Sequence, residues 1–76
     1  MEELLDILYE INPDVDYETE DRLIDGQVFD SFSIISLISE ISNVFDIEIG
    51  PKYLVNENFN SAKAMWAMIQ AIQDDE

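Results

Sequence analysis

The residues of this chain best suited to chemistry are Asp30 and Ser31, a carboxylate and a hydroxyl directly before an apolar-striped segment. Both are preferred N-cap residues, because a short side-chain oxygen can accept a hydrogen bond from a free N–H of the first helical turn. The sequence therefore predicts that a helix begins at one of the two. A hydroxyl there lies at the positive end of the helix dipole, which favours a phosphate group. The simpler interpretation is that Ser31 only caps the helix.

The helix that follows has two large apolar residues outside its core-facing arc. At about 100° per residue, the residues expected to face the core are Ile34, Leu37, Ile38, Ile41, Val44 and Phe45. The polar side contains Ser36, Ser39, Glu40 and Asn43. Phe32 and Ile35 also lie outside the core arc, close to Ser31, and burial in the core does not explain them.

Enzymatic chemistry has little support in the composition. The 76 residues include no His and no Cys, so the chain lacks an imidazole base, a thiol nucleophile, a disulfide and the two soft metal ligands. We therefore predict that the chain is not an enzyme and has no metal site. The alternating acids from Asp14 to Glu20 do not form a calcium loop, because Thr19 occupies the position that needs Gly and Asp25 the position that needs Glu.

The charge is strongly negative, with 18 acids against 3 bases and a formal net charge of −15. Nucleic acids and anionic membranes are disfavoured as partners because they bind Lys and Arg, whereas basic protein surfaces are favoured. Self-repulsion predicts a monomer. No basic start is followed by an apolar stretch, and no apolar run approaches the length of a membrane span. We therefore expect a cytoplasmic protein without membrane insertion.

Two segments precede the central helix. A helix is predicted from Glu2 to about Asn12, because an apolar stripe at helical spacing ends before Pro13, which disfavours helix in its predecessor. The stripe consists of Leu4, Ile7, Leu8 and Ile11. A long loop over 14–29 follows. We expect its apolar second half to attach it to the core, and Gly26 to supply a turn with positive φ.

The central helix is predicted to end near Phe45 or Asp46. The alternating segment 47–49 can place two Ile side chains inward, and 52–58 has room for only a short helical turn. The apolar residues expected to anchor these parts are Tyr53, Leu54, Val55 and Phe59. The nearby Asn56, Asn58 and Asn60 are interpreted as turn and cap residues.

A last helix is predicted from Asn60 or Ser61 to about Gln73, with a solvated acidic tail at 74–76. Its buried stripe is Met65, Met68, Ile69 and Ile72, with Trp66 at the margin. Three main helices that each have one apolar stripe must face a common centre. The predicted fold is therefore an all-α four-helix bundle, with three main helices, one short helix and a long first loop, in a single domain of residues 1–76.

This order of parts resembles the acyl carrier protein family over nearly the whole chain. The resemblance depends on the Asp30-Ser31-Phe32 motif, the amphipathic helix after it, the Ile47-Glu48-Ile49 segment and the acidity. It implies that Ser31 carries a 4′-phosphopantetheine arm, installed from coenzyme A by a phosphopantetheinyl transferase. It also implies that Asp30 helps to place the Mg²⁺ of that transferase. The arm would hold an acyl or aminoacyl group as a thioester.

The resemblance further implies an acyl- or aminoacyl-activating ligase and downstream acyl-transfer or synthase enzymes as partners. Their expected contacts are Phe32, Ile35, Ser36, Ser39 and Glu40. The two apolar residues before Asp30 make the motif more similar to D-alanyl and other specialised carriers than to fatty-acid carriers. Because fatty-acid carriers keep several acids where this helix has serines, we expect docking to depend more on Phe32 and Ile35 than on Glu40. The alternative is an acidic interaction module with the same bundle and no arm.

Overall fold

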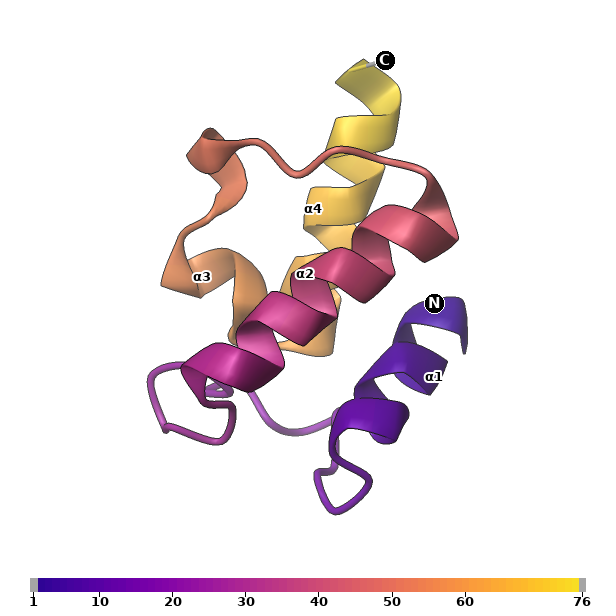
Figure 1. The fold of residues 1–76 in the computed structure, drawn as a ribbon. Coiled ribbons are helices and arrows are strands. Elements are labelled where there is room, and N and C mark those ends of the chain that lie inside the picture. The colour runs from indigo at the N-terminus through magenta and orange to yellow at the C-terminus, as the bar shows by residue number, and fades with distance from the viewer. Residues whose placement is uncertain (1, 76) are drawn as a thin grey trace.

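Four α-helices and one 3-10 turn occur in residues 2–75, which the computed structural model describes (Figure 1). Three helices are long, α1 (Glu2–Ile11), α2 (Ser31–Phe45) and α4 (Ala62–Asp75), and α3 (Asn56–Phe59) is short. The 3-10 turn, η1 (Pro51–Tyr53), precedes α3. Because these residues include no strand, the predicted all-α bundle with a long first loop is confirmed.

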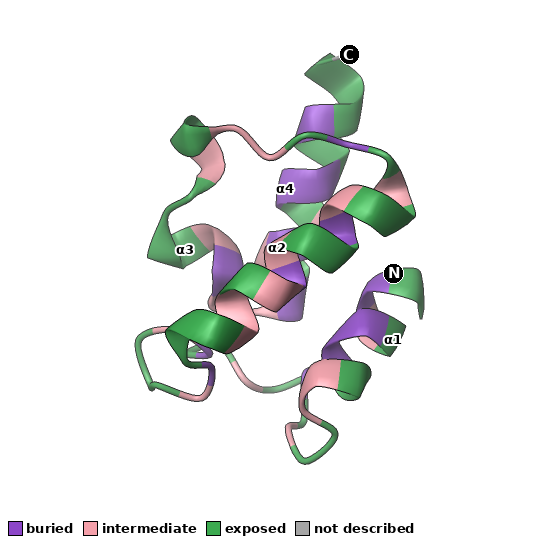
Figure 2. Cartoon of the chain, in the orientation of Figure 1, coloured by how far each residue is buried: buried purple, intermediate pink, exposed green. Residues whose placement is uncertain are grey.

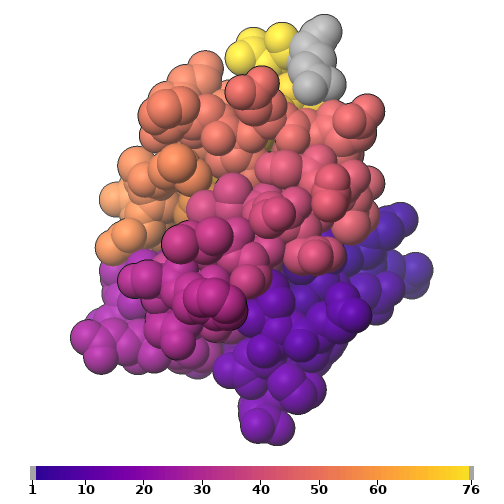
Figure 3. All heavy atoms as spheres, in the orientation of Figure 1, coloured from indigo at the N-terminus to yellow at the C-terminus, as the bar shows by residue number. Residues whose placement is uncertain are grey.

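The helices pack so that one side of α2 stays exposed among residues 2–75. α1 packs against α2 and α4, and α3 packs against α4. Figure 3 shows α2 across the middle of one face, between the indigo α1 and the orange α3. The first loop runs from the end of α1 along the lower edge of the bundle to the start of α2 (Figure 1).

Each long helix contributes one buried stripe, as its apolar spacing predicts. The fully buried large side chains are Leu4, Leu8, Leu23, Leu37, Ile41, Met65 and Ile69. They come from all three long helices and from the first loop, so the loop is part of the core. Each such side chain contributes roughly 1.5–3 kcal/mol relative to an exposed one. Ile11, Ile34, Ile38 and Phe45 are partly buried at the edge of this core.

Val44 departs from the predicted buried face of α2, because 49% of its surface is exposed. It lies in the last turn of α2, where none of the fully buried side chains of this helix occurs. The next residue, Phe45, is held by an edge-to-face contact with Trp66, with ring centroids 5.9 Å apart.

The acidic half of the first loop is attached to α1 by Tyr17, which is buried. Its hydroxyl donates to the carbonyl oxygens of Leu8, at 2.9 Å, and Asn12, at 2.7 Å. The carbonyl oxygen of Leu8 also accepts a hydrogen bond from the N–H of Asn12 at 2.9 Å, so the tyrosine adds to the bonding at the end of α1. Burial, and secondarily the electrostatic interaction with Tyr9, raises the pKa of Tyr17 to about 12.

The apolar half of the first loop is attached to the core, as predicted: Leu23 and Phe29 are buried, and Ile24 and Val28 pack against the core. The prediction for Gly26 is wrong. The positive φ, 59°, belongs to Gln27. Gly26 is needed for space instead, since a Cβ at this position would lie 2.6 Å from the carbonyl oxygen of Arg22.

The segment after α2 has the predicted inward Ile side chains, with Ile47 buried and Ile49 packed against the core. The helix ends at Phe45, and Asp46 follows with a left-handed backbone (φ 53°). Phe59 is buried as predicted, but the prediction of Leu54 and Val55 as core anchors is wrong. Their side chains are 48% and 44% exposed, because they lie between η1 and α3 on the rim of a cavity.

The last helix confirms its predicted stripe, with Met65, Met68, Ile69 and Ile72 all buried. Ser61 is its cap residue, since the Ser61 hydroxyl accepts a hydrogen bond from the N–H of Ala64 at 3.0 Å. The helix continues to Asp75, so two residues assigned to the acidic tail are helical, and Glu76 lies outside the described residues. None of the described helices is long and apolar enough to cross a lipid bilayer.

Candidate functional site

Ser31 is the first residue of α2, and Asp30 is its N-cap. The backbone of Asp30 is extended, and its carboxylate accepts a hydrogen bond from the N–H of Ser33 at 2.8 Å. Its carbonyl oxygen accepts from the N–H of Ile34 at 3.0 Å. Of the two cap residues that the sequence left open, Asp30 therefore does the capping. The exposed Ser31 hydroxyl makes no hydrogen bond to any residue in 2–75.

The carboxylate beside this hydroxyl stays ionised. The N–H of Ser33, and after it the Ser33 side chain, hold the pKa of Asp30 below its usual value. Asp30 is exposed, so a protein that approaches Ser31 meets a fixed negative charge next to it. A single carboxylate together with phosphate oxygens is a common way to bind Mg²⁺. The pair thus offers a free hydroxyl and a hard oxygen ligand on the same helix end.

The outer side of α2 exposes apolar surface next to Ser31. Phe32 is 79% exposed and Ile35 is 67% exposed, so both lie outside the core as predicted. Ser39 and Glu40 are exposed on the same helix, while Ser36 is half-buried. In Figure 2 the side of α2 that faces the viewer is mostly green and pink, the colours of exposed and half-buried residues. Four of the five predicted partner residues are therefore exposed, and the fifth is half-buried.

A small apolar cavity lies between α2 and the segment that contains α3. Its volume is about 140 Å³, close to that of engineered apolar cavities that bind benzene. Ile34, which lines this cavity, is three positions after Ser31 in the sequence. The lining residues are Ile24, Ile34, Ile38, Leu54, Val55, Asn56 and Phe59. Apolar side chains dominate this lining, so the cavity suits an apolar group better than a charged one.

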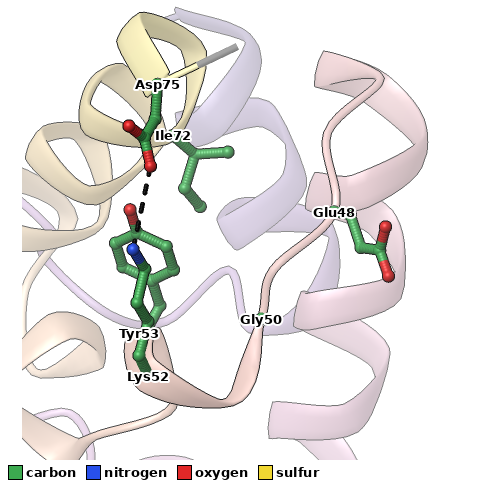
Figure 4. Close-up of a pocket in the computed structure, with 6 residues that line it drawn as sticks. All are labelled: Glu48, Gly50, Lys52, Tyr53, Ile72 and Asp75. Carbon is green, nitrogen blue, oxygen red and sulfur yellow. Dashed lines mark ion pairs between the residues drawn. The ribbon is translucent and has the colours of Figure 1, made fainter.

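A larger hollow of about 320 Å³ lies between η1 and the end of α4 (Figure 4). The ammonium of Lys52 is 3.7 Å from the carboxylate of Asp75 and 5.0 Å from the centre of the Tyr53 ring. Both partners of this ion pair are about 70% exposed, and the Glu48 side chain points away from them (Figure 4). None of the lining residues comes from 30–40, so this hollow is separate from the candidate site.

Two residues that support the site were not singled out from the sequence. Tyr17 holds the start of the first loop. The sequence marks it only as a single aromatic residue among acidic ones. Asn60 was interpreted as a turn or cap residue, but its side chain accepts hydrogen bonds from the N–H groups of Ile24 and Asp25. These partners precede it by 36 and 35 positions, and no local pattern marks such a contact.

Comparison of this chain with protein-family models, with curated proteins and with solved structures found no match. Among the described residues, no three Asp or Glu side chains converge closely enough to hold a metal ion. The candidate site therefore consists of an exposed hydroxyl, an ionised carboxylate and two exposed apolar side chains.

Proposed function

We propose that this chain is a carrier protein that holds an acyl or aminoacyl group on a 4′-phosphopantetheine arm attached to Ser31. The observation that carries the proposal is the exposed, unbonded Ser31 hydroxyl at the start of α2, beside the ionised carboxylate of Asp30. A tether point has to be open to a modifying enzyme, and this oxygen is.

The residues around Ser31 fit the arm. Its phosphodiester would lie at the positive end of the α2 dipole, where backbone N–H groups favour an anion. The 140 Å³ cavity beside α2 is lined mainly by apolar side chains, which suit a small apolar group. When attached, the arm supplies a thiol on which the cargo is held as a thioester. Asp30 would help to place the Mg²⁺ of the phosphopantetheinyl transferase.

The chain itself would present the cargo and perform no chemistry. Phe32 and Ile35 would contact the transferase, the activating ligase and the downstream acyl-transfer or synthase enzymes. Aromatic side chains such as Phe are enriched at the centres of protein interfaces, and the apolar side chain of Ile35 would extend the same contact surface. The acids of the chain would steer encounters with basic partner surfaces. We expect the protein to act as a monomer in the cytoplasm.

Intact-mass measurement tests the proposal. The protein is incubated with coenzyme A, Mg²⁺ and a promiscuous phosphopantetheinyl transferase. We expect a mass gain of one phosphopantetheinyl unit that is absent in Ser31→Ala. Ser42→Ala is the matched control, because it removes a hydroxyl from the same helix outside the candidate site, and it should be modified like the wild type. A wild-type protein that gains no mass would favour the alternative, an acidic interaction module that binds partners through Phe32 and Ile35.

A further inference from the structure

Asn60 holds three consecutive backbone N–H groups of the first loop. Its carbonyl oxygen accepts a hydrogen bond from Leu23 at 2.9 Å, and its side-chain Oδ1 accepts from both Ile24 and Asp25 at 3.0 Å. Its Nδ2 donates to the Asp25 carboxylate at 2.9 Å. Asn60 lies between α3 and α4, so these bonds attach the loop to the opposite half of the chain.

The turn that Asn60 holds ends at the candidate site. The carbonyl oxygen of Leu23 accepts a hydrogen bond from the N–H of Phe29 at 3.0 Å. Both side chains are buried, with 0% and 4% of their surface exposed. Phe29 directly precedes Asp30 and Ser31. Because the 23–29 turn is closed by its own hydrogen bond, whatever fixes Leu23, Ile24 and Asp25 also fixes the point from which α2 starts.

We propose that Asn60 is a positioning residue for Ser31, which sets the place of the hydroxyl relative to the rest of the bundle. The inference rests on the proposed carrier function. A displacement of about 1 Å at a reacting group can cost roughly 100-fold in rate, even when the altered residue is remote. Loss of the Asn60 side-chain bonds should therefore slow the modification of Ser31 without removing any group that the transferase contacts.

Asn56 provides a matched control of the same residue type. Its Nδ2 donates to the same Asp25 carboxylate, at 3.3 Å, but its side chain makes no bond to the loop backbone. The bond is exposed and longer than those of Asn60. Asn56→Ala should therefore leave the turn in place, whereas Asn60→Ala frees the N–H groups of Ile24 and Asp25.

A charge exchange keeps the test valid even if Asn60→Ala does not fold. Asn60→Asp keeps an oxygen acceptor for the N–H groups of Ile24 and Asp25. Its carboxylate, however, replaces the amide donor and repels the carboxylate of Asp25. Adding Asp25→Asn restores the pairing, since the new amide at 25 donates to the carboxylate at 60. The double variant has the net charge of the wild type, and it should recover wild-type behaviour.

The first readout is amide hydrogen exchange of the unmodified protein, at a temperature where every variant is folded. In Asn60→Ala, exchange at Ile24, Asp25 and Phe29 should rise at least about tenfold, because local opening becomes easier. In Asn56→Ala and in the double variant it should stay within about twofold of the wild type. This readout does not depend on the arm. If the wild type is not modified at all, raised exchange at Phe29 still supports the role of Asn60 and unchanged exchange overturns it.

The second readout is the rate of Ser31 modification. In Asn60→Ala, kcat should fall about tenfold or more while KM changes less than about twofold, because the reacting oxygen is misplaced and the docking side chains are intact. A merely structural role would leave kcat of the folded variant unchanged, and that result would overturn the inference. A double variant as slow as Asn60→Asp alone would overturn it as well.

Discussion

The two faces of α2 hold similar residues in opposite environments. On the inner face, Leu37 and Ile41 are fully buried, whereas on the outer face Phe32 and Ile35 are 79% and 67% exposed. An exposed side chain of this size forgoes roughly 1.5–3 kcal/mol of burial. The inner face therefore stabilises the fold, and the outer face contributes little to it. The exposed pair adjoins Ser31, which is why we propose that the outer face serves recognition.

The largest effect should come from the inner face. We expect Leu37→Ala to lower the free energy of unfolding by about 2–5 kcal/mol, because it removes a fully buried side chain and leaves a cavity. Ile35→Ala is the control on the same helix and should change the stability by less than about 0.5 kcal/mol. Urea denaturation measures both. Similar losses from the two variants would remove the distinction between the faces.

Substitutions on the outer face of α2 should change the kinetics of Ser31 modification by the transferase. We expect Phe32→Ala and Ile35→Ala to lower kcat/KM for Ser31 modification about tenfold each, as truncated interface contacts do. Glu40→Lys should cost only about two- to threefold, because an exposed ion pair contributes little. Steady-state kinetics with the transferase give the ranking. A larger loss from Glu40→Lys than from the apolar variants would contradict the assignment.

Val44 is an intermediate case, because its exposed fraction lies between those of the inner-face and outer-face residues. Its side chain is 49% exposed, so Val44→Ala should lower the free energy of unfolding by about 1 kcal/mol or less. It should not affect Ser31 modification, since it lies at the other end of α2. Denaturation and the same kinetic assay check both statements. A loss as large as that of Leu37→Ala would mean that the inner face extends over the last turn.

The smallest effect should come from the charge that caps α2. The hydrogen bond from the Ser33 N–H lowers the pKa of Asp30 in the folded protein. The stability that this charge contributes is therefore present above the unfolded pKa of about 3.9, and it is lost as pH falls through the folded value. Asn also caps helices well. Asp30→Asn should thus be slightly less stable than the wild type at pH 7, and equally stable in strong acid.

Thermal melts of both proteins between neutral and acid pH at low salt test this prediction. A stability difference that does not change with pH would show that the charge of Asp30 is not what stabilises the helix end.

Periodicity in the sequence was sufficient to predict the helices and most of the core. Stripes such as Leu4–Leu8 and Met65–Ile72 repeat at helical spacing, and a helix with such a stripe must bury it. Phe32 and Ile35 were placed outside the core for the same reason. Val44 was misplaced because the pattern says which way a residue faces and does not say whether another part of the chain covers it.

The contacts of the first loop could not be predicted in the same way. Tyr17 and Asn60 act through individual side-chain hydrogen bonds to residues elsewhere in the chain, and such bonds leave no repeating pattern. Gly26 was correctly marked as special, but for the wrong reason. It avoids a clash with the Arg22 carbonyl, while Gln27 adopts the left-handed backbone. The residue types alone thus predicted a turn at Gly26. Which residue has the positive φ and which one avoids a clash depends on three-dimensional contacts.

The position of the modified oxygen is the most direct test of the account. α2 contains five serines, at 31, 33, 36, 39 and 42, and cleavage after Arg22 and Lys52 releases all of them in one peptide. Fragment mass spectra of this peptide, taken after reaction with coenzyme A and the transferase, locate the added group. The account predicts the phosphopantetheinyl group on Ser31 alone. A group on any of the other four serines, or an unmodified peptide, would contradict it.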